Sequence, residues 1–199
     1  MDGSPAIGRV AEIVIAVERR IMMVRFGGRR AFDVCRNSPV HAQYGHAVRL
    51  GLTEMEVDLS GPKAGGLDRV LVQDLPNQDL GYEGSHLQRH DGRYYLFTCH
   101  FARGHRKTED CFIADSLDGE FRGRCILDDD LGYHDQGVAQ GGMVDTPDGQ
   151  WYAFMFQDRG ALGRTPVLMP MAHGRVHRPS VRTDPPPSRS AAVRCCRER

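Results

Sequence analysis

The sequence predicts an all-β protein built from β-propeller blades, and the main observation behind this fold class is a segment that occurs twice. Residues 84–97 align without a gap with residues 141–154, at a constant offset of 57 positions. Each copy reads as a short strand, an Asp-Gly turn and an aromatic strand, which is the pattern of a β-hairpin. A repeat of this length made of antiparallel strands is typical of propeller blades. The alternative is two unrelated hairpins that share a common turn.

The composition supports this fold class and excludes some partners. The 199 residues include 23 glycines, which suits a chain of strands and turns, and basic and acidic residues balance at 26 each. A balanced charge favours neither nucleic acid nor an anionic membrane surface as a partner. No apolar run has the length of a membrane span, and no two cysteines are spaced as Cys-x-x-Cys. We therefore expect a cytoplasmic protein with reduced thiols and no secretory signal.

Residues 1–43 are an unassigned N-terminal segment. Two apolar runs, at residues 13–17 and 21–24, are separated by the charged residues 18–20, and an Arg- and Gly-rich stretch follows. An amphipathic helix and an irregular pair of strands fit this pattern equally well.

Residues 44–171 are the expected propeller domain. Strand patterns at residues 47–50, 53–57 and 69–73 predict the outer strands of a blade whose inner half should lie upstream. A full blade follows, with strands expected at residues 85–88, 94–100, 111–114 and 121–127. The next blade has strand patterns at residues 142–144, 151–156 and 166–169, and the pattern of a fourth strand is missing.

Residues 172–199 are rich in Arg, Pro and Ser and predict a disordered tail. This bias is also what out-of-frame translation of a GC-rich gene produces, and we expect that origin for both ends of the chain.

Glu83 is the candidate catalytic residue. It precedes the first copy of the repeat as Gln140 precedes the second, so both should point to the same mouth of the central channel from neighbouring blades. A carboxyl group flanked by Tyr82 and Gly84 is partly removed from water, which favours the protonated form that a general acid needs. The alternative is a solvated glutamate in a turn.

Several motifs follow one another in the order that they have in a known family. Residues 80–86 (LGYEGSH) and 91–97 (DGRYYLF) are similar to the segment that carries the general acid in family 43 glycoside hydrolases. Residues 140–152 (QGGMVDTPDGQWY) and 156–160 (FQDRG) resemble the signature of the next blade, and residues 49–55 (RLGLTEM) the strand before the acid. The resemblance covers residues 44–171, in family order.

The resemblance implies a five-bladed propeller, of which two to three blades are present, and an inverting glycosidase with three carboxylates. Glu83 matches the general acid. The base and the residue that orients the acid are Asp residues of blades upstream of Tyr44, and neither has a match in this chain. Asp2 and Asp33 stand in contexts that resemble neither motif, so they carry no role.

The resemblance also suggests substrate-binding residues, which are Tyr82, Gln140, Arg159 and His134. Arg159 stands where an arginine contacts sugar hydroxyls, although a surface arginine paired with Asp158 is an equal alternative. Many members have a histidine before the Gly-Gly pair that helps to hold a central calcium ion. This chain has Ala139 there, so no metal ligand is assigned, although His134 is near enough to substitute and a structural calcium ion stays an expectation.

Two further metal interpretations carry less weight. His86 and His90 cannot share one ion, because a strand and a turn separate them. His100 and His105 with Cys99 and Cys111 could form a zinc site, and residues 128–130 could hold calcium, although a solvated acidic turn is the simpler interpretation of three adjacent aspartates.

The predicted function is hydrolysis of O-glycosidic bonds in xylose- or arabinose-containing oligosaccharides, with inversion. Two alternatives stay open. One is a catalytically inactive carbohydrate-binding propeller fragment that keeps a sugar-facing surface of Tyr82, Trp151 and Arg159, and the other is a propeller-type interaction scaffold. Binding of oligosaccharides without turnover would indicate the first, and absence of binding the second.

Overall fold

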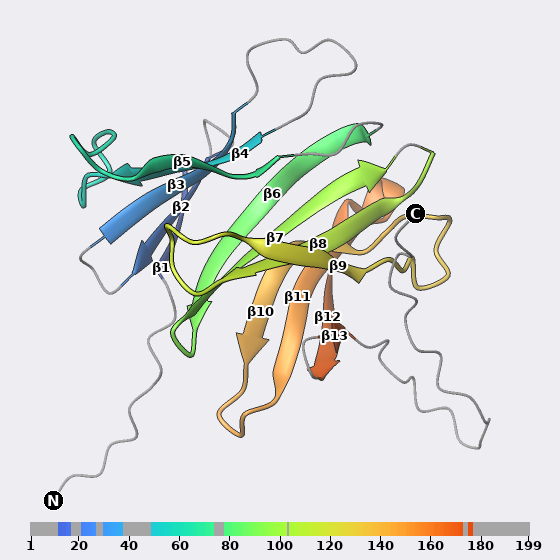
Figure 1. Ribbon diagram of the computed structural model, residues 1–199. Helices are drawn as coiled ribbons and strands as arrows, with labels where there is room; N and C mark the ends of the chain where they lie inside the picture. The colour runs from blue at the N-terminus through green and yellow to red at the C-terminus, as the bar shows by residue number, and fades with distance from the viewer. Residues whose placement is uncertain are drawn as a thin grey trace, which may run out of the picture.

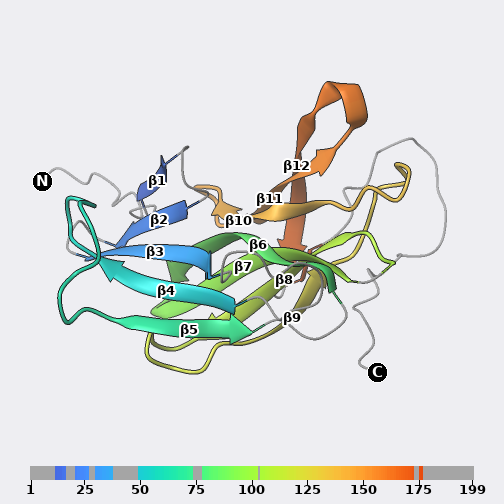
Figure 2. The same cartoon turned by 90° about the horizontal axis from the view of Figure 1, so that it is seen from above.

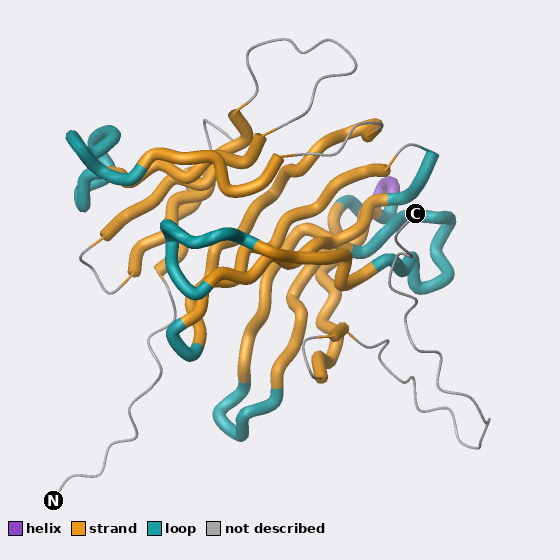
Figure 3. The backbone as a smooth tube through the Cα atoms, in the orientation of Figure 1, coloured by secondary structure: helices purple, strands orange, loops and turns teal. Residues whose placement is uncertain are grey.

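The computed structural model describes residues 12–16, 21–26, 30–37, 49–73, 78–102, 104–172 and 175–176. These residues form three antiparallel sheets, so the all-β class is confirmed (Figure 1). In the tube view the strands are joined by loops and turns, with a short 3₁₀ helix at Gly160–Leu162 (Figure 3). In the described part of the chain, no helix has the length and the apolar character needed to cross a membrane.

The first sheet has five strands in sequence order. They are β1 (Glu12–Ala16), β2 (Ile21–Phe26), β3 (Arg30–Asn37), β4 (Arg49–Met55) and β5 (Asp68–Gln73). The apolar runs upstream of residue 43 are therefore strands and not a helix, because each pairs with its neighbour in the sheet. They supply the inner half of the blade that the sequence predicts there. The expected boundary at residue 43 falls inside this sheet, between β3 and β4.

The second sheet is the complete blade that the sequence predicts. Its strands, in order, are β6 (Gln78–His90), β7 (Arg93–Ala102), β8 (Lys107–Ala114) and β9 (Arg122–Leu127). The turn between β6 and β7 is the two-residue loop Asp91-Gly92, in which both residues have positive φ (46° and 80°). These angles are typical of the type I′ turn that Asp-Gly favours.

The third sheet contains β10 (Ala139–Asp145), β11 (Trp151–Asp158), β12 (Arg164–Ala172) and β13 (Arg175–Val176). The expectation that the fourth strand is missing is wrong. A two-residue strand pairs with the end of β12, and it is too short to leave a pattern in the sequence. The hairpin turn also differs from that of the first copy, since it spans residues 146–150. Pro147 holds φ negative and so prevents a type I′ turn at this place.

The second sheet lies between the other two, as neighbouring blades do in a propeller (Figure 2). Its innermost strand β6 contacts β2 and β3 on one side and β10 on the other. One apolar cluster joins the first and second sheets, through residues such as Phe32, Leu52, Leu87 and Leu96. Two further clusters join the second and third sheets, around Leu127 and Met155 and around Phe97. These buried layers fix how the innermost strands β6 and β10 lie side by side.

The rest of the predicted tail, apart from β13 and the end of β12, lies outside the described residues, as does Asp2.

Candidate functional site

Glu83 lies in an irregular part of the innermost strand β6. The pairing of β6 with β7 shifts register between Leu80 and Glu83 and again between Glu83 and His86. Such bulges re-aim side chains and often occur beside functional sites. The carbonyl group of Glu83 accepts a hydrogen bond from Thr98 Oγ1 at 3.0 Å and a longer one from Cys99 Sγ at 3.4 Å. Side chains of β7 thus satisfy a backbone group that the bulge takes out of the regular ladder.

The structure places Gln140 of the third sheet against Gly84, the residue that follows Glu83 in the second sheet. Gly84 has φ of +58°, and a Cβ atom added there would lie 2.3 Å from Cγ of Gln140. The Gln140 side chain therefore covers Gly84 at a distance that only glycine allows. Gln140 itself has φ of +64° and lies at the register shift between Ala139 and Gly142 in β10. Both inner strands are irregular at the same end of their blades.

Tyr82 does not have the place that a substrate-binding residue needs. Its side chain is 5% exposed and belongs to the apolar cluster between the first and second sheets. The hydroxyl group donates a hydrogen bond to Asp110 Oδ2 at 3.0 Å, and the ring packs edge-on against His100 and Phe112. The structure corrects the sequence prediction here, because the Tyr82 side chain is buried in the interface between the first and second sheets.

Two buried carboxyl groups of β8, Glu109 and Asp110, flank this region and were missed by the sequence analysis. Glu109 is fully buried, and its Oε2 accepts a hydrogen bond from the backbone N–H group of Gln140 at 2.7 Å; the N–H group of Gly141 also acts to lower the pKa of this carboxyl group. Loss of hydration raises the pKa of Glu109 to about 8. Burial also raises the pKa of Asp110, against the lowering effects of His100 and of the Tyr82 hydroxyl. The pattern KTEDCFIA gave only a weak signal, since a charged half-strand is usually solvated.

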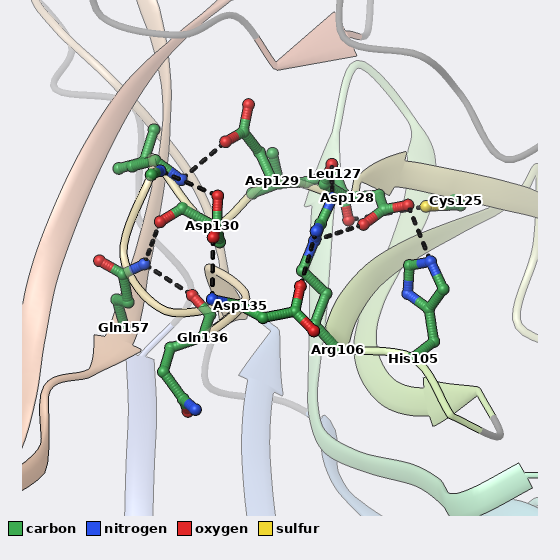
Figure 4. Close-up of polar contacts among 12 residues, drawn as sticks. His105, Arg106, Cys125, Leu127, Asp128, Asp129, Asp130, Asp135, Gln136 and Gln157 are labelled. Carbon is green, nitrogen blue, oxygen red and sulfur yellow. Dashed lines mark hydrogen bonds and ion pairs between the residues drawn. The ribbon is translucent and has the colours of Figure 1, made fainter.

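A loop of residues 128–138 connects β9 to β10 and is held by side chains from two sheets (Figure 4). Arg106 forms ion pairs with Asp128 at 2.7 Å and with Asp135 at 2.9 Å. From β11, the side-chain amide of Gln157 donates to the carbonyl groups of Asp130 and Gln136, both at 2.6 Å. Gln157 is fully buried, so it holds the loop of residues 128–138 against the third sheet from the protein interior.

His134 is exposed on this loop, with its ring edge-on to that of Tyr133. It lines a hollow of about 270 Å³ together with residues of both sheets, which include Phe101, Lys107 and Asp158. Lys107 Nζ is 2.8 Å from Asp158 Oδ2, so a lysine of the second sheet and an aspartate of the third form the wall between the two blades.

Arg159 directly follows β11, at the end of the third sheet where the loop of residues 128–138 enters β10. Its Nε and Nη2 atoms donate to Gln157 Oε1 at 3.0 and 2.7 Å, and its guanidinium lies 4.5 Å from the centre of the Tyr133 ring. The alternative of a surface pair with Asp158 is wrong, since Asp158 pairs with Lys107 and, at 3.6 Å, with Arg164.

Tyr82, Trp151 and Arg159, which the carbohydrate-binding alternative requires on one sugar-facing surface, lie apart in the structure. Trp151 begins β11 and Arg159 follows its end, about 25 Å apart along an extended strand. Trp151 lines a mostly apolar cavity of about 580 Å³ between the second and third sheets, with Tyr95, Ile126 and Met171. Because Tyr82 is buried elsewhere, these three residues do not share a face.

The residues that the structure describes contain no group of three or more His, Cys, Asp or Glu side chains placed to hold a metal ion. Asp129 and Asp130 instead accept hydrogen bonds from backbone N–H groups of their own loop. Ala139, which replaces the family's histidine, is fully buried. The structural calcium ion stays a prediction. Cys99, Cys111 and Cys125 are free thiols.

Comparison with solved structures gives several neighbours of one kind. A bifunctional GH43-CE protein of Bacteroides eggerthii is 28% identical, with 83% of this chain and 25% of that chain covered and a TM-score of 0.57. A thermostable family-43 glycoside hydrolase is 18% identical over 90% of this chain and 60% of that chain, with a TM-score of 0.59. A xylan β-1,4-xylosidase from Bacillus halodurans C-125 is 17% identical over 76% of this chain and 30% of that chain, with a TM-score of 0.56.

These neighbours confirm that the fold resembles that of the family 43 glycoside hydrolases. The chain spans between a quarter and three fifths of the length of these three neighbours. No protein-family model matches the sequence, and no curated protein matches it either.

Proposed function

We propose that this chain, which has a fold of the family 43 glycoside hydrolase type, acts on O-glycosidic bonds of xylose- or arabinose-containing oligosaccharides, with Glu83 as the general acid. The observation that carries the proposal is that Glu83 lies between two register shifts of the innermost strand β6, next to Gly84, which Gln140 of the neighbouring innermost strand covers. The structural neighbours support the reaction class, and the xylosidase among them supports the sugar class.

In this proposal Glu83 gives a proton to the glycosidic oxygen as the bond to the sugar breaks. Its side chain is half-buried, so the surrounding strands restrict it while a substrate can still reach it. Inversion requires a second carboxylate ~6.5–9.5 Å away, with a water molecule between it and the sugar. We assign no residue of this chain to that base.

Gln140, Arg159 and His134 are the proposed sugar contacts. Gln140 lies directly beside Gly84, and Arg159 and His134 lie at the same end of the blades. Arg159 is preoriented by Gln157 and Tyr133, so a hydroxyl group that binds it would not have to order a flexible side chain.

The test compares the wild type with Glu83→Gln on aryl β-xylosides and aryl α-L-arabinofuranosides. Glu83→Gln should lose ~10²–10⁴-fold in rate on substrates with poor leaving groups, because these need the proton most. Glu120→Gln, at an exposed position, is the matched control. An NMR assay of the first-formed anomer should show inversion. An unchanged rate in Glu83→Gln would remove Glu83 from the mechanism, whereas sugar binding without turnover in the wild type would indicate a binding module.

A further inference from the structure

We propose that Glu109 and Asp110, consecutive buried carboxyl residues of β8, are positioning residues that hold Glu83 from both faces of the second sheet. The proposal rests on the proposed role of Glu83 as the acid. Because successive residues of a strand point to opposite faces, Asp110 reaches toward the first sheet and Glu109 toward the third.

Asp110 holds the residue before Glu83. Its Oδ2 accepts the hydrogen bond from the Tyr82 hydroxyl at 3.0 Å and lies 3.5 Å from His100 Nδ1. The Tyr82 ring is enclosed by His100 and Phe112, with centroid distances of 5.2 and 5.6 Å. With its ring enclosed and its hydroxyl bonded, Tyr82 fixes the backbone on one side of Glu83.

Glu109 holds the residue after Glu83, through the neighbouring blade. Cys99 of β7 pairs with Glu83 of β6 on one side and with Glu109 of β8 on the other, so the two glutamates share a row and a face of the sheet. Glu109 Oε2 accepts the N–H group of Gln140, which lies at the bulge in β10, and the N–H group of Gly141 also favours the charged form of this carboxyl group. This contact keeps Gln140 in its left-handed conformation, and its side chain then covers Gly84.

The pair supplies geometry more than stability. A buried carboxyl group costs free energy unless its oxygens are satisfied, and both residues leave one oxygen without a hydrogen-bond partner in this structure, Glu109 Oε1 and Asp110 Oδ1. An apolar side chain would avoid this cost, but it could accept neither the Gln140 N–H nor the Tyr82 O–H. The two carboxyl groups therefore set where the bulge around Glu83 lies.

The test uses Glu109→Ala and Asp110→Ala, each with its conservative partner, Glu109→Gln or Asp110→Asn, which keeps an acceptor oxygen. Glu54→Ala is the matched control, because Glu54 is a buried carboxyl of the first sheet whose partners are Arg30, Lys63 and the Leu67 N–H group. The readouts are the backbone amide NMR resonances of Glu83 and Gly84 and the hydrogen-exchange rates of the Gln140 and Gly141 amides. None of these needs turnover.

Both Ala variants should shift the Glu83 and Gly84 resonances, and Glu109→Ala should speed exchange of the Gln140 and Gly141 amides by at least ~10-fold, since their acceptor is lost. The conservative variants should restore the wild-type values. With active protein, the Ala variants should lose rate on poor leaving groups and keep it on good ones.

Resonances that stay unchanged in both Ala variants, or that move equally in Glu54→Ala, would overturn the positioning role. A wild type without turnover would instead count against the proposed function, and the NMR readouts would still decide whether the two carboxyl groups hold this segment.

Discussion

Replacing the buried carboxyl group of Glu109 by an amide should make the protein more stable near neutral pH. The folded state raises the pKa of Glu109 from 4.5 to about 8, because the side chain is fully buried. Between these values the folded protein holds a proton that the unfolded chain has released. Stability must therefore fall as pH rises through this window.

The magnitude follows from the two pKa values. A slope of about 1.4 kcal/mol per pH unit, reduced near pH 4.5 where the unfolded chain is still partly protonated, gives a loss of about 2.5 kcal/mol between pH 5 and pH 7. Glu109→Gln has no proton to release and keeps an acceptor for the Gln140 N–H. The free energy of unfolding of Glu109→Gln should therefore not show this decrease between pH 5 and pH 7.

The assay is urea unfolding at pH 5, 6 and 7, followed by the fluorescence of Trp151, the single tryptophan of the chain. The quantity of interest is the difference between the wild type and Glu109→Gln at each pH, because other titrating groups contribute equally to both. This difference should grow by about 2.5 kcal/mol in favour of Glu109→Gln from pH 5 to pH 7. Parallel curves, or a difference that shrinks as pH rises, would refute the argument that burial keeps Glu109 protonated.

Three further predictions concern single features of the fold. The hydrogen bond with Arg30 is the main cause that lowers the pKa of Glu54 to about 2, so the stability that Glu54 contributes should be lost as pH falls from about 4.5 toward 2. Glu54→Gln should lower the free energy of unfolding by about 1–3 kcal/mol in urea at pH 7. This is less than the full pKa shift would give, because the cationic partners of Glu54 are half exposed. Gly84→Ala should destabilise more than Gly92→Ala in thermal melts, since both have positive φ but only the Cβ at position 84 meets a side chain; equal costs would contradict the close approach. Phe154 and Leu168, each 51% exposed on paired strands of the third sheet, form an apolar patch, so a Phe154→Ser/Leu168→Ser variant should self-associate less in sedimentation velocity runs, and unchanged association would exclude this patch.

The sequence by itself determined the blade pattern of the second and third sheets. The Asp-Gly turn, the alternating aromatics and the offset of 57 are local features, and a hairpin depends mainly on local turn geometry and alternation. The same offset matches Glu83-Gly84 to Gln140-Gly141, and in the structure Gln140 lies against Gly84, because equivalent residues of neighbouring blades occupy equivalent places around the channel. The resemblance of residues 80–86 and 140–152 to a known family rested on this regularity.

The apolar runs before residue 43 show that a local sequence pattern does not always distinguish a helix from a strand. They fit a helix or a pair of strands. The pairing of β1 with β2 and of β2 with β3, which is itself held by β4 beyond an intervening stretch of chain, decided for strands. The short β13 and the loop at Pro147 were likewise fixed by pairing partners and by one backbone constraint rather than by periodicity.

Only the tertiary structure decided which charged and polar groups are buried. Tyr82 faces inward and meets Asp110, Glu109 reaches across to the next blade, and Arg159 pairs with Gln157 instead of its neighbour Asp158. A carboxyl group in a strand has the same sequence pattern whether water or another sheet covers it. The difference arises when two blades pack together, because burial removes hydration and leaves each polar group to find its partner on a segment distant in the sequence.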